Sequence, residues 1–220
     1  MLDRTDHFPP QFDDLPPQSV APGADPDTLH AAPVVNPYHR FWFSRGYGFA
    51  PPPSSPYRPS SSKMMVQYDQ AVFANGTVDG TAQIDLGPQR DNPCLHFNLL
   101  SFDLGCNSTQ AACRFNITGL RNLGDPQLDV PVVSNVFNVS ACPSQTNCSL
   151  SRVTVGSAYS NLTSINIQLT VGNSTTETWW GDDLQLGWTN NTCASANCRS
   201  RVRNAVKLAR KPRGSLAAKG

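Results

Sequence analysis

Asparagine and cysteine side chains dominate the chemistry that this sequence could support. Seven cysteines and eight N-x-S/T sequons lie between residues 75 and 198, where chance would supply roughly three sequons. The sequon asparagines are Asn75, Asn107, Asn116, Asn138, Asn147, Asn161, Asn173 and Asn190. Such asparagines accept N-linked oligosaccharides in the secretory pathway, where thiols are also oxidised to disulfides. The sequence therefore predicts a secreted glycoprotein that works outside the cell or in the cell wall.

The cysteine spacing favours local disulfides. Cys106–Cys113, Cys142–Cys148 and Cys193–Cys198 each bracket a few polar, turn-prone residues, so we expect three bridges that close loops. Each would stabilise the fold by roughly 2–3 kcal/mol. Cys94 is then left over, either as a buried free thiol or as a partner for another segment or chain. A zinc site is the weaker alternative, because the sequence has no C-x-x-C and no histidine close to the local pairs.

Composition favours an all-β fold. The chain has 220 residues, which suits one domain with appended arms. Glu177 is its only glutamate, whereas Thr, Ser, Val, Asn and Pro are plentiful. The charge is split along the chain. Nine Lys or Arg stand against sixteen acidic residues up to Cys198, and eight basic residues with no acid follow it.

The first 62 residues form a proline-rich arm. They hold thirteen of the nineteen prolines, which disfavours a regular helix or a central strand. Residues 38–49 nevertheless carry six aromatic side chains, too large an apolar load for a solvated linker. We expect this arm to pack on the domain and to contribute a strand or two, the first near residues 11–15.

Residues 63–193 show the alternation of β-strands. In residues 162–171, Ile165, Ile167 and Leu169 share one face and polar residues share the other. The apolar parity slips between residues 99 and 102, as a β-bulge would cause. The same parity turns Asn116 and Asn138 towards water, where a glycan could stand. We predict a two-sheet antiparallel sandwich for this core domain.

The order of several short motifs adds a family resemblance. Residues 12–15 (FDDL), 37–39 (PYH), 101–106 (SFDLGC), 115–119 (FNITG), 161–164 (NLTS) and 179–184 (WWGDDL) follow one another as they do in an uncharacterised domain common at the C-termini of fungal secreted proteins. More distantly, the chain is similar to jelly-roll, galactose-binding-like carbohydrate-binding modules. The resemblance spans about residues 11–193. It implies a jelly roll that is non-catalytic in most relatives, often sugar-binding and often equipped with one structural calcium.

The resemblance draws attention to two pairs of aspartates. In a jelly roll the first and last strands commonly lie side by side, which would bring Asp13 and Asp14 towards Asp182 and Asp183. Two or three carboxylates with backbone carbonyls could hold one structural calcium ion. The reading that we favour instead lets one aspartate of each pair face water and the other cap a turn. No other cofactor is required.

Exposed aromatic faces are the candidates for sugar binding. Neighbouring strand residues point to opposite faces, and parity with Leu184, Leu186 and Trp188 turns Trp180 inward and Trp179 outward. Trp179 would then be a stacking platform, with Trp42, Tyr47 and Tyr57 as further candidates from the arm. The alternative, which we prefer, is that the arm covers Trp179 and buries these side chains as a second core.

Catalysis has little support in the sequence. Glycoside hydrolysis needs two carboxyl groups across a cleft, and Asp13, Asp103, Asp182 and Asp183 qualify only by residue type. G-x-S-x-G, H-E-x-x-H and P-loop motifs are missing. His39 and His96 lie in apolar surroundings that suggest packing. We therefore expect no catalytic residues.

The two ends of the chain leave alternatives open. Residues 194–220 form a basic tail that is either disordered, which we favour, or a short amphipathic helix able to touch an anionic surface. The first residues do not resemble a signal peptide, so either a leader has been removed or the chain is a segment of a longer secreted protein. A cytosolic chain with coincidental sequons is the less favoured third reading.

These observations predict a non-catalytic secreted module of the cell surface or cell wall, with surface glycan as its candidate partner. The alternative is a purely structural glycosylated domain without a small ligand, and a glycoside-active hydrolase is the least favoured reading. We expect no nucleic-acid partner and no transmembrane segment. The sequence does not indicate an oligomeric state.

Overall fold

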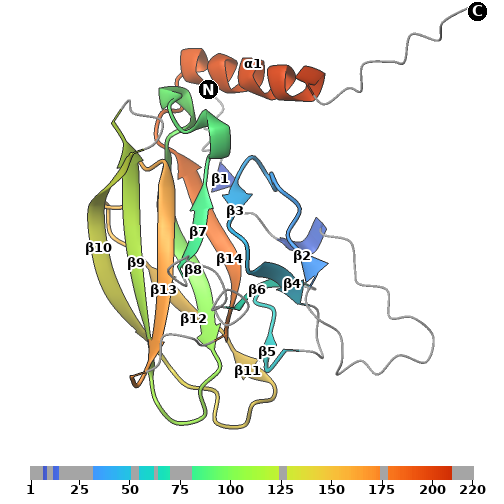
Figure 1. The fold of residues 1–220 in the computed structure, drawn as a ribbon, viewed down its shortest axis with the longest axis vertical. Helices are drawn as coiled ribbons and strands as arrows, with labels where there is room; N and C mark the ends of the chain where they lie inside the picture. The colour runs from blue at the N-terminus through green and yellow to red at the C-terminus, as the bar shows by residue number, and fades with distance from the viewer. Residues whose placement is uncertain are drawn as a thin grey trace, which may run out of the picture.

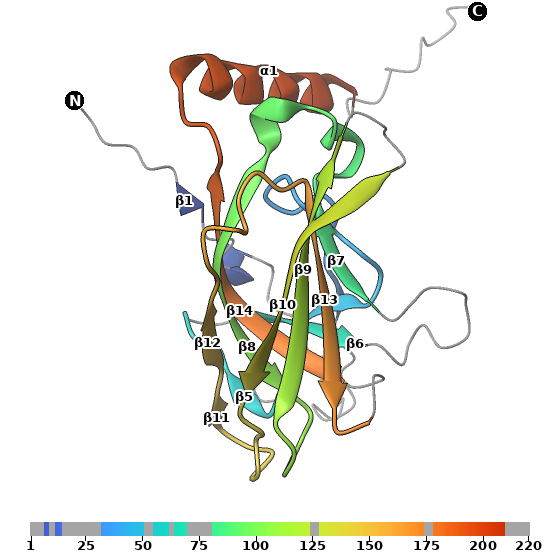
Figure 2. The ribbon, with the colours of Figure 1, turned by 90° about the vertical axis from the view of Figure 1, so that its left-hand side faces the viewer.

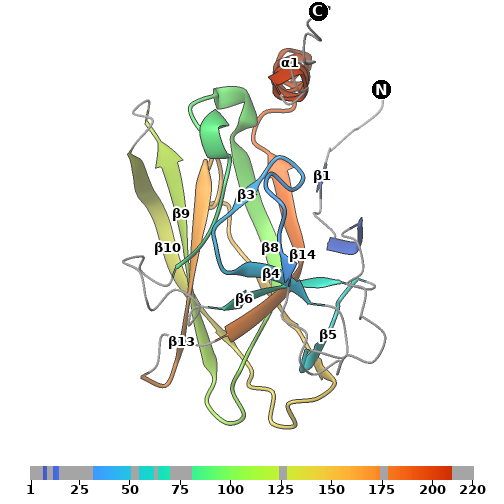
Figure 3. The ribbon, with the colours of Figure 1, turned by 45° about the vertical axis from the view of Figure 1, so that its right-hand side comes forward.

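Two antiparallel β-sheets pack face to face in the computed structural model (Figure 1). The structure describes residues 7–8, 12–14, 32–50, 55–61, 64–69, 81–123, 128–173 and 178–209. The sequon at Asn75 and the end of the basic tail lie outside these residues. Figure 3 shows the two layers, with β9, β10 and β13 in one and β8 and β14 in the other.

The larger sheet has seven strands. Its order is β12 (Ser151–Thr154), β8 (Phe97–Cys106), β14 (Thr178–Trp188), β6 (Met65–Asp69), β4 (Tyr47–Ala50) and β2 (Ala32–Pro33), with β1 (His7–Phe8) also paired to β14. All neighbouring strands in it are antiparallel. The long strand β14 is therefore its centre, because β8, β6 and β1 all pair with it.

The second sheet has five strands. Its order is β10 (Asp129–Val139), β9 (Cys113–Asn122), β13 (Ser164–Val171), β7 (Ala82–Asp85) and β3 (Trp42–Phe43). A separate parallel pair, β11 (Cys148–Ser149) with β5 (Tyr57–Arg58), lies beside the sandwich. The predicted all-β sandwich is confirmed.

Alternating side chains build the core between the sheets. Ile165, Ile167 and Leu169 of β13 are fully buried, and Phe115 and Ile117 of β9 face the same interior. The predicted bulge is also present, because the register between β8 and β14 shifts around Ser101 and Gln185. Periodicity thus located both the core face and the irregularity in it.

The proline-rich arm takes part in both sheets. Strands β2 and β4 extend the seven-stranded sheet, whereas β3 extends the five-stranded sheet. The first strand is not where we expected it. Residues Phe12–Asp14 form the 3-10 helix η1, and the strand that pairs with β14 is β1 at His7–Phe8. The first and last strands are therefore neighbours, but the first strand lies a few residues earlier in the sequence than predicted.

The disulfides correct one predicted pairing. Cys106–Cys113 and Cys142–Cys148 are bonded as expected. Cys198, however, pairs with Cys94 across 104 residues, and Cys193 is the free, exposed cysteine. Local spacing misled us here, because Cys193 and Cys198 both lie on one helix and the fold brings Cys94 to that helix.

That helix is α1 (Cys193–Ala209), which lies across one end of the sandwich (Figures 1 and 2). The prediction of a disordered tail is wrong for this part, and the helical alternative holds. Arg199 is buried where α1 meets the domain and donates to the carbonyl oxygens of Cys94 at 3.2 Å and Asn190 at 2.6 Å. Its guanidinium also lies 5.1 Å from the ring centre of Trp188.

Among the described residues, no helix combines the length and the hydropathy needed to span a membrane.

Candidate functional site

The densest group of charged and polar side chains lies at a β-bulge on the outer face of the seven-stranded sheet. Asp182 of β14 is opposite Asp103 of β8, and Gln185 is opposite Ser101, so β14 carries one extra residue there. Within the bulge, Asp183 has a φ of +48°. Bulges redirect side chains, and this one presents successive aspartates to different neighbours.

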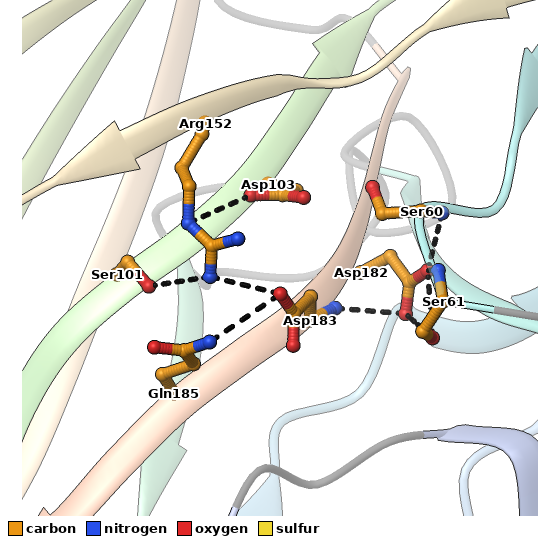
Figure 4. A network of polar contacts seen from close by, with 8 residues as sticks. All are labelled: Ser60, Ser61, Ser101, Asp103, Arg152, Asp182, Asp183 and Gln185. Carbon is orange, nitrogen blue, oxygen red and sulfur yellow. Dashed lines mark hydrogen bonds and ion pairs between the residues drawn. The ribbon is translucent and has the colours of Figure 1, made fainter.

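Asp182 is a buried carboxyl group held by its own chain. It has no exposed surface and accepts hydrogen bonds from the backbone N–H groups of Ser60 at 2.6 Å, Ser61 at 3.0 Å and Asp183 at 2.8 Å (Figure 4). The hydroxyl of Ser61 donates a further bond to it at 3.2 Å. Asp182 therefore ties the segment before β6 to the middle of β14.

Two effects oppose each other at this carboxyl group. Burial raises the pKa of Asp182 above its ordinary value, and the N–H groups of Ser61, Asp183 and Ser60 lower it in part. The balance leaves the pKa raised. This pattern fits a carboxylate enclosed for structural purposes, because its lone pairs are directed at backbone donors.

Arg152 of β12 joins the other two carboxylates. Its Nη2 donates to the hydroxyl of Ser101 at 3.0 Å and to Oδ2 of Asp183 at 2.8 Å. Its Nε lies 3.6 Å from Oδ1 of Asp103, which is buried. Gln185 completes the group by donating to Asp183 at 3.4 Å. Figure 4 shows the guanidinium between Asp103 and Asp183, facing both carboxylates.

Three of the predicted calcium ligands have described side chains, and each of these makes other contacts. Asp182 and Asp183 are engaged as described, and Asp14 is bonded to the hydroxyl of Tyr38 and to Nε2 of His39, the latter at 2.8 Å. The side chain of Asp13 lies outside the described residues. Within the described part of the chain, no group of three or more His, Cys, Asp or Glu side chains is arranged to hold a metal ion.

Trp179 is fully buried, so the prediction of an outward Trp179 is wrong. Its ring packs against four aromatic rings. The distances between ring centres are 5.6 Å to Tyr47 and Tyr68, 6.1 Å to Phe102 and 6.0 Å to Phe115. The bulge explains the error. We counted parity back from Trp188 across the extra residue, and one extra residue exchanges the two faces of a strand.

Trp180 consequently lies on the outer face, and a second apolar cluster covers it. This outer cluster contains Tyr57, Met65, Cys142 and Trp180, with Cys148 and Leu150 against it. The rings of Tyr57 and Trp180 are 5.6 Å apart, and the Trp180 indole N–H donates to Gln67 at 3.2 Å. Gly105 permits this packing, because a Cβ there would lie 2.5 Å from the Tyr57 ring.

The other predicted aromatic contacts are also used internally. Tyr47 and Tyr57 are buried, and the half-buried Trp42 covers Gly87, where a Cβ would lie 2.2 Å from its indole nitrogen. The preferred reading, in which the arm buries these side chains as a second core, holds for Tyr57, which lies in the outer cluster, whereas Trp179 and Tyr47 lie in the main core between the sheets. A small apolar pocket lies beside α1 and is lined by Phe41, Phe97, Leu186, Gly187 and Trp188.

Sequence reasoning missed most of the bulge site. Arg152 could have been singled out as an outward-facing charge, because Val153 beside it is buried. Ser60 and Ser61 carried no signal, since they contact Asp182 across more than 120 residues of chain. Asp103 was considered only by residue type, and the structure places it opposite Asp182.

The sequons differ in their surroundings. Asn107, Asn138, Asn147, Asn173 and Asn190 are exposed, whereas Asn116 and Asn161 are half-buried. Four of them accept hydrogen bonds through their side-chain oxygen, or share one with a histidine ring: Asn116, Asn147, Asn161 and Asn190. Thr163, which completes the sequon of Asn161, is fully buried.

Comparison with known proteins agrees with the fold. A crystal structure of a DUF4465 family protein from Bacteroides caccae ATCC 43185 is similar, with a TM-score of 0.52 and 9% sequence identity over 83% of this chain and 99% of that chain. No curated protein matches the sequence. The model of a domain of unknown function, DUF7371, matches residues 4–199, which include the arm, both sheets and the first turns of α1. The chain therefore belongs to the DUF7371 family of domains of unknown function.

Proposed function

We propose that this chain is an extracellular, non-catalytic structural module of the cell surface or cell wall. The observation that carries the proposal is the use of the candidate ligand-binding side chains within the fold. Trp179 packs against four aromatic rings, and Asp182 accepts four hydrogen bonds from Ser60, Ser61 and Asp183. Side chains committed in this way stabilise the domain and are not available to a small ligand.

Three features support an extracellular setting. The disulfides Cys94–Cys198, Cys106–Cys113 and Cys142–Cys148 suit an oxidising compartment. Five of the sequon asparagines are exposed. The disulfide Cys94–Cys198 closes a loop of 104 residues and ties α1 to the sandwich. Such a bond suits a domain that must stay folded outside the cell, where no chaperones refold it.

Glycan binding is the second candidate, and one observation favours it. The outer face of the five-stranded sheet carries amides and hydroxyls, among them Asn166, Gln168 and Thr170 of β13 and Thr118 of β9. Oδ1 of Asn166 is buried and has no hydrogen-bond partner within the described chain. Sugar hydroxyls are suitable partners for the amide and hydroxyl groups of this face, and Asn166 would join them by turning its amide outward.

One set of measurements tests the structural proposal. The secreted protein would be melted with and without a chelator and then applied to a glycan array beside the variants Asn166→Ala and Trp179→Phe. We expect an unchanged melting temperature and no array signal. A melting temperature that falls with chelator would establish a structural metal. Array binding that Asn166→Ala removes and Trp179→Phe retains would establish the second candidate in place of the first.

A further inference from the structure

Strand β10 forms an open edge of the five-stranded sheet. It has eleven residues and is hydrogen-bonded to β9 alone. An edge strand presents unpaired N–H and C=O groups, which can pair with a strand of another molecule. The length of β10 makes this edge the longest in the described part of that sheet, since β3 at the other edge has two residues.

The first third of this edge has its own protection. Pro131 lacks an N–H, and the register with β9 shifts between Pro131 and Val133. Asp129, the only charged residue of the strand, is turned to its own sheet, where it accepts from Ser164 at 3.1 Å and lies 3.4 Å from Arg90. The charge of Asp129 therefore does not prevent another strand from pairing with the rest of the edge.

Residues 133–139 lack these devices. They pair with β9 in unbroken register, contain no proline, and have no charged side chain. Val136 is 49% exposed and Val132, just before this stretch, is 42% exposed. A long, regular and uncharged edge with exposed valines is the kind of strand that associates through its edge.

Asn138 is the sequon residue within this unprotected stretch. It is opposite Arg114 and stands two residues from Val136, so both side chains lie on the outer face. Its side chain makes no hydrogen bond within the described chain, and both Asn138 and Ser140 are exposed. Asn116, the other sequon residue inside a strand, is half-buried and accepts a hydrogen bond from Ser134 at 2.9 Å.

We propose that an N-linked oligosaccharide on Asn138 blocks the β10 edge and keeps the protein from pairing with a second copy of itself. The inference rests on the proposed extracellular setting. In the attachment step, Nδ2 of Asn138 bonds to the anomeric carbon of a lipid-pyrophosphate-linked oligosaccharide. The lipid pyrophosphate leaves, and the amide loses one proton to solvent.

A second copy is the occupant that the bare edge would accept. Two β10 strands related by a twofold axis run antiparallel, so a residue before the centre of one strand meets a residue after the centre of the other, and the two five-stranded sheets join into one. In a pairing of residues 133–139, centred on Val136, Asp129 of each copy lies outside the paired stretch and away from the other Asp129. Charge therefore does not oppose this pairing.

The test compares variants of the secreted protein from a glycosylating yeast. Ser140→Ala removes the sequon and keeps Asn138, and Thr109→Ala removes the sequon of Asn107 in an exposed loop as the matched control. Val136→Lys added to Ser140→Ala introduces a charge into the edge. Peptide mass spectrometry reads the occupancy of each asparagine, and light scattering after gel filtration reads the protein mass.

We expect an occupied Asn138 and a monomer for the wild type and for Thr109→Ala. Ser140→Ala should have twice the protein mass, and the added Val136→Lys should return it to the monomer. If Ser140→Ala is not secreted, native removal of glycans from the wild type with an endoglycosidase gives the same comparison, with Val136→Lys treated in parallel. A bare Asn138 in a monomeric wild type, or a monomeric Ser140→Ala, would overturn the proposal.

If every sequon were bare, the extracellular function itself would fail. If the other sequons were occupied and Asn138 bare, only this inference would fail.

Discussion

The outer faces of the two sheets are built in opposite ways. On the seven-stranded sheet, the outer cluster around Tyr57 and Trp180 and the bulge site around Arg152 and Asp182 cover the strands. On the five-stranded sheet, β9, β10 and β13 present hydroxyls, amides and exposed valines to water. Of the side chains that first suggested ligand chemistry, Tyr57, Asp103, Asp182 and Asp183 lie on the covered face, whereas Trp179 and Tyr47 lie in the core between the sheets. Chemical versatility of a residue therefore says little about function until its neighbours are known.

The largest expected effects are losses of unfolding free energy at buried tryptophans, compared with a valine on the open face. Trp179→Ala should lower the free energy of unfolding by about 4 kcal/mol and Trp180→Ala by about 3 kcal/mol, because both remove a buried indole. Val136→Ala on the open face should change it by less than about 0.5 kcal/mol. Denaturant unfolding measures all three. Equal, small losses for Trp180→Ala and Val136→Ala would mean that the outer cluster is not a second core.

Asp182→Asn should produce the next largest effect. The NH2 group of asparagine cannot accept, so either the N–H groups of Ser60 and Ser61, which share Oδ2, or the N–H of Asp183, which donates to Oδ1, lose their acceptor, and we expect a loss of about 2 kcal/mol at neutral pH. Hydrogen exchange should become faster at Ser60 and Ser61 or at Asp183, with β10 unchanged. Uniform acceleration over both sheets would show that Asp182 does not act on this segment.

The stability of the wild type relative to Asp182→Asn should also depend on pH. Because burial raises the pKa of Asp182, the folded state retains this proton more firmly than the unfolded state does. The stabilisation that this group gives is fully present below its unfolded pKa of about 3.9 and declines as pH rises through the raised folded pKa. Unfolding free energies of both proteins over this range measure the difference. A difference that grows with rising pH would contradict the raised pKa.

A smaller contrast is expected between two arginines. Arg152→Ala leaves the buried Asp103 without its nearby cation and should cost about 1 kcal/mol. Arg114 of β9 is exposed on the open face, and its replacement by Ala should be neutral to within about 0.5 kcal/mol. Thermal unfolding of the two variants in parallel supplies the comparison. Indistinguishable melting temperatures would mean that Arg152 contributes no more to stability than an exposed arginine on the open face.

The sequence predicted the sandwich because alternation is a local property. Strand β13 could be assigned from Ile165, Ile167 and Leu169 alone, and the slip of parity near Ser101 located the bulge. A second shift beside it defeated the prediction for Trp179, since an extra residue on β14, between Asp182 and Gln185, lay between Trp179 and the residues used for counting. Periodicity is reliable within an unbroken strand and reverses beyond an inserted residue.

Long-range contacts were beyond this kind of reasoning. Cys94–Cys198 joins residues 104 positions apart, and spacing in the sequence favoured the nearer Cys193. The bonds from Ser60 and Ser61 to Asp182 depend on where the arm lies on the sandwich, which no local pattern encodes. The candidate site was therefore predicted only in its aspartates, and their donors came from the fold.

The central claim is that Trp179, Tyr47 and Tyr57, three of the aromatic side chains considered for ligand binding, are closed off from solvent by the fold. Hydroxyl-radical footprinting of the native, disulfide-bonded protein tests this directly, because it reads side-chain exposure residue by residue. Indole and phenol rings react readily when exposed, so the account predicts protection of Trp179, Trp180 and Tyr57 alongside clear oxidation of Leu123, which is 71% exposed. Oxidation of Trp180 and Tyr57 as fast as Leu123 would contradict it.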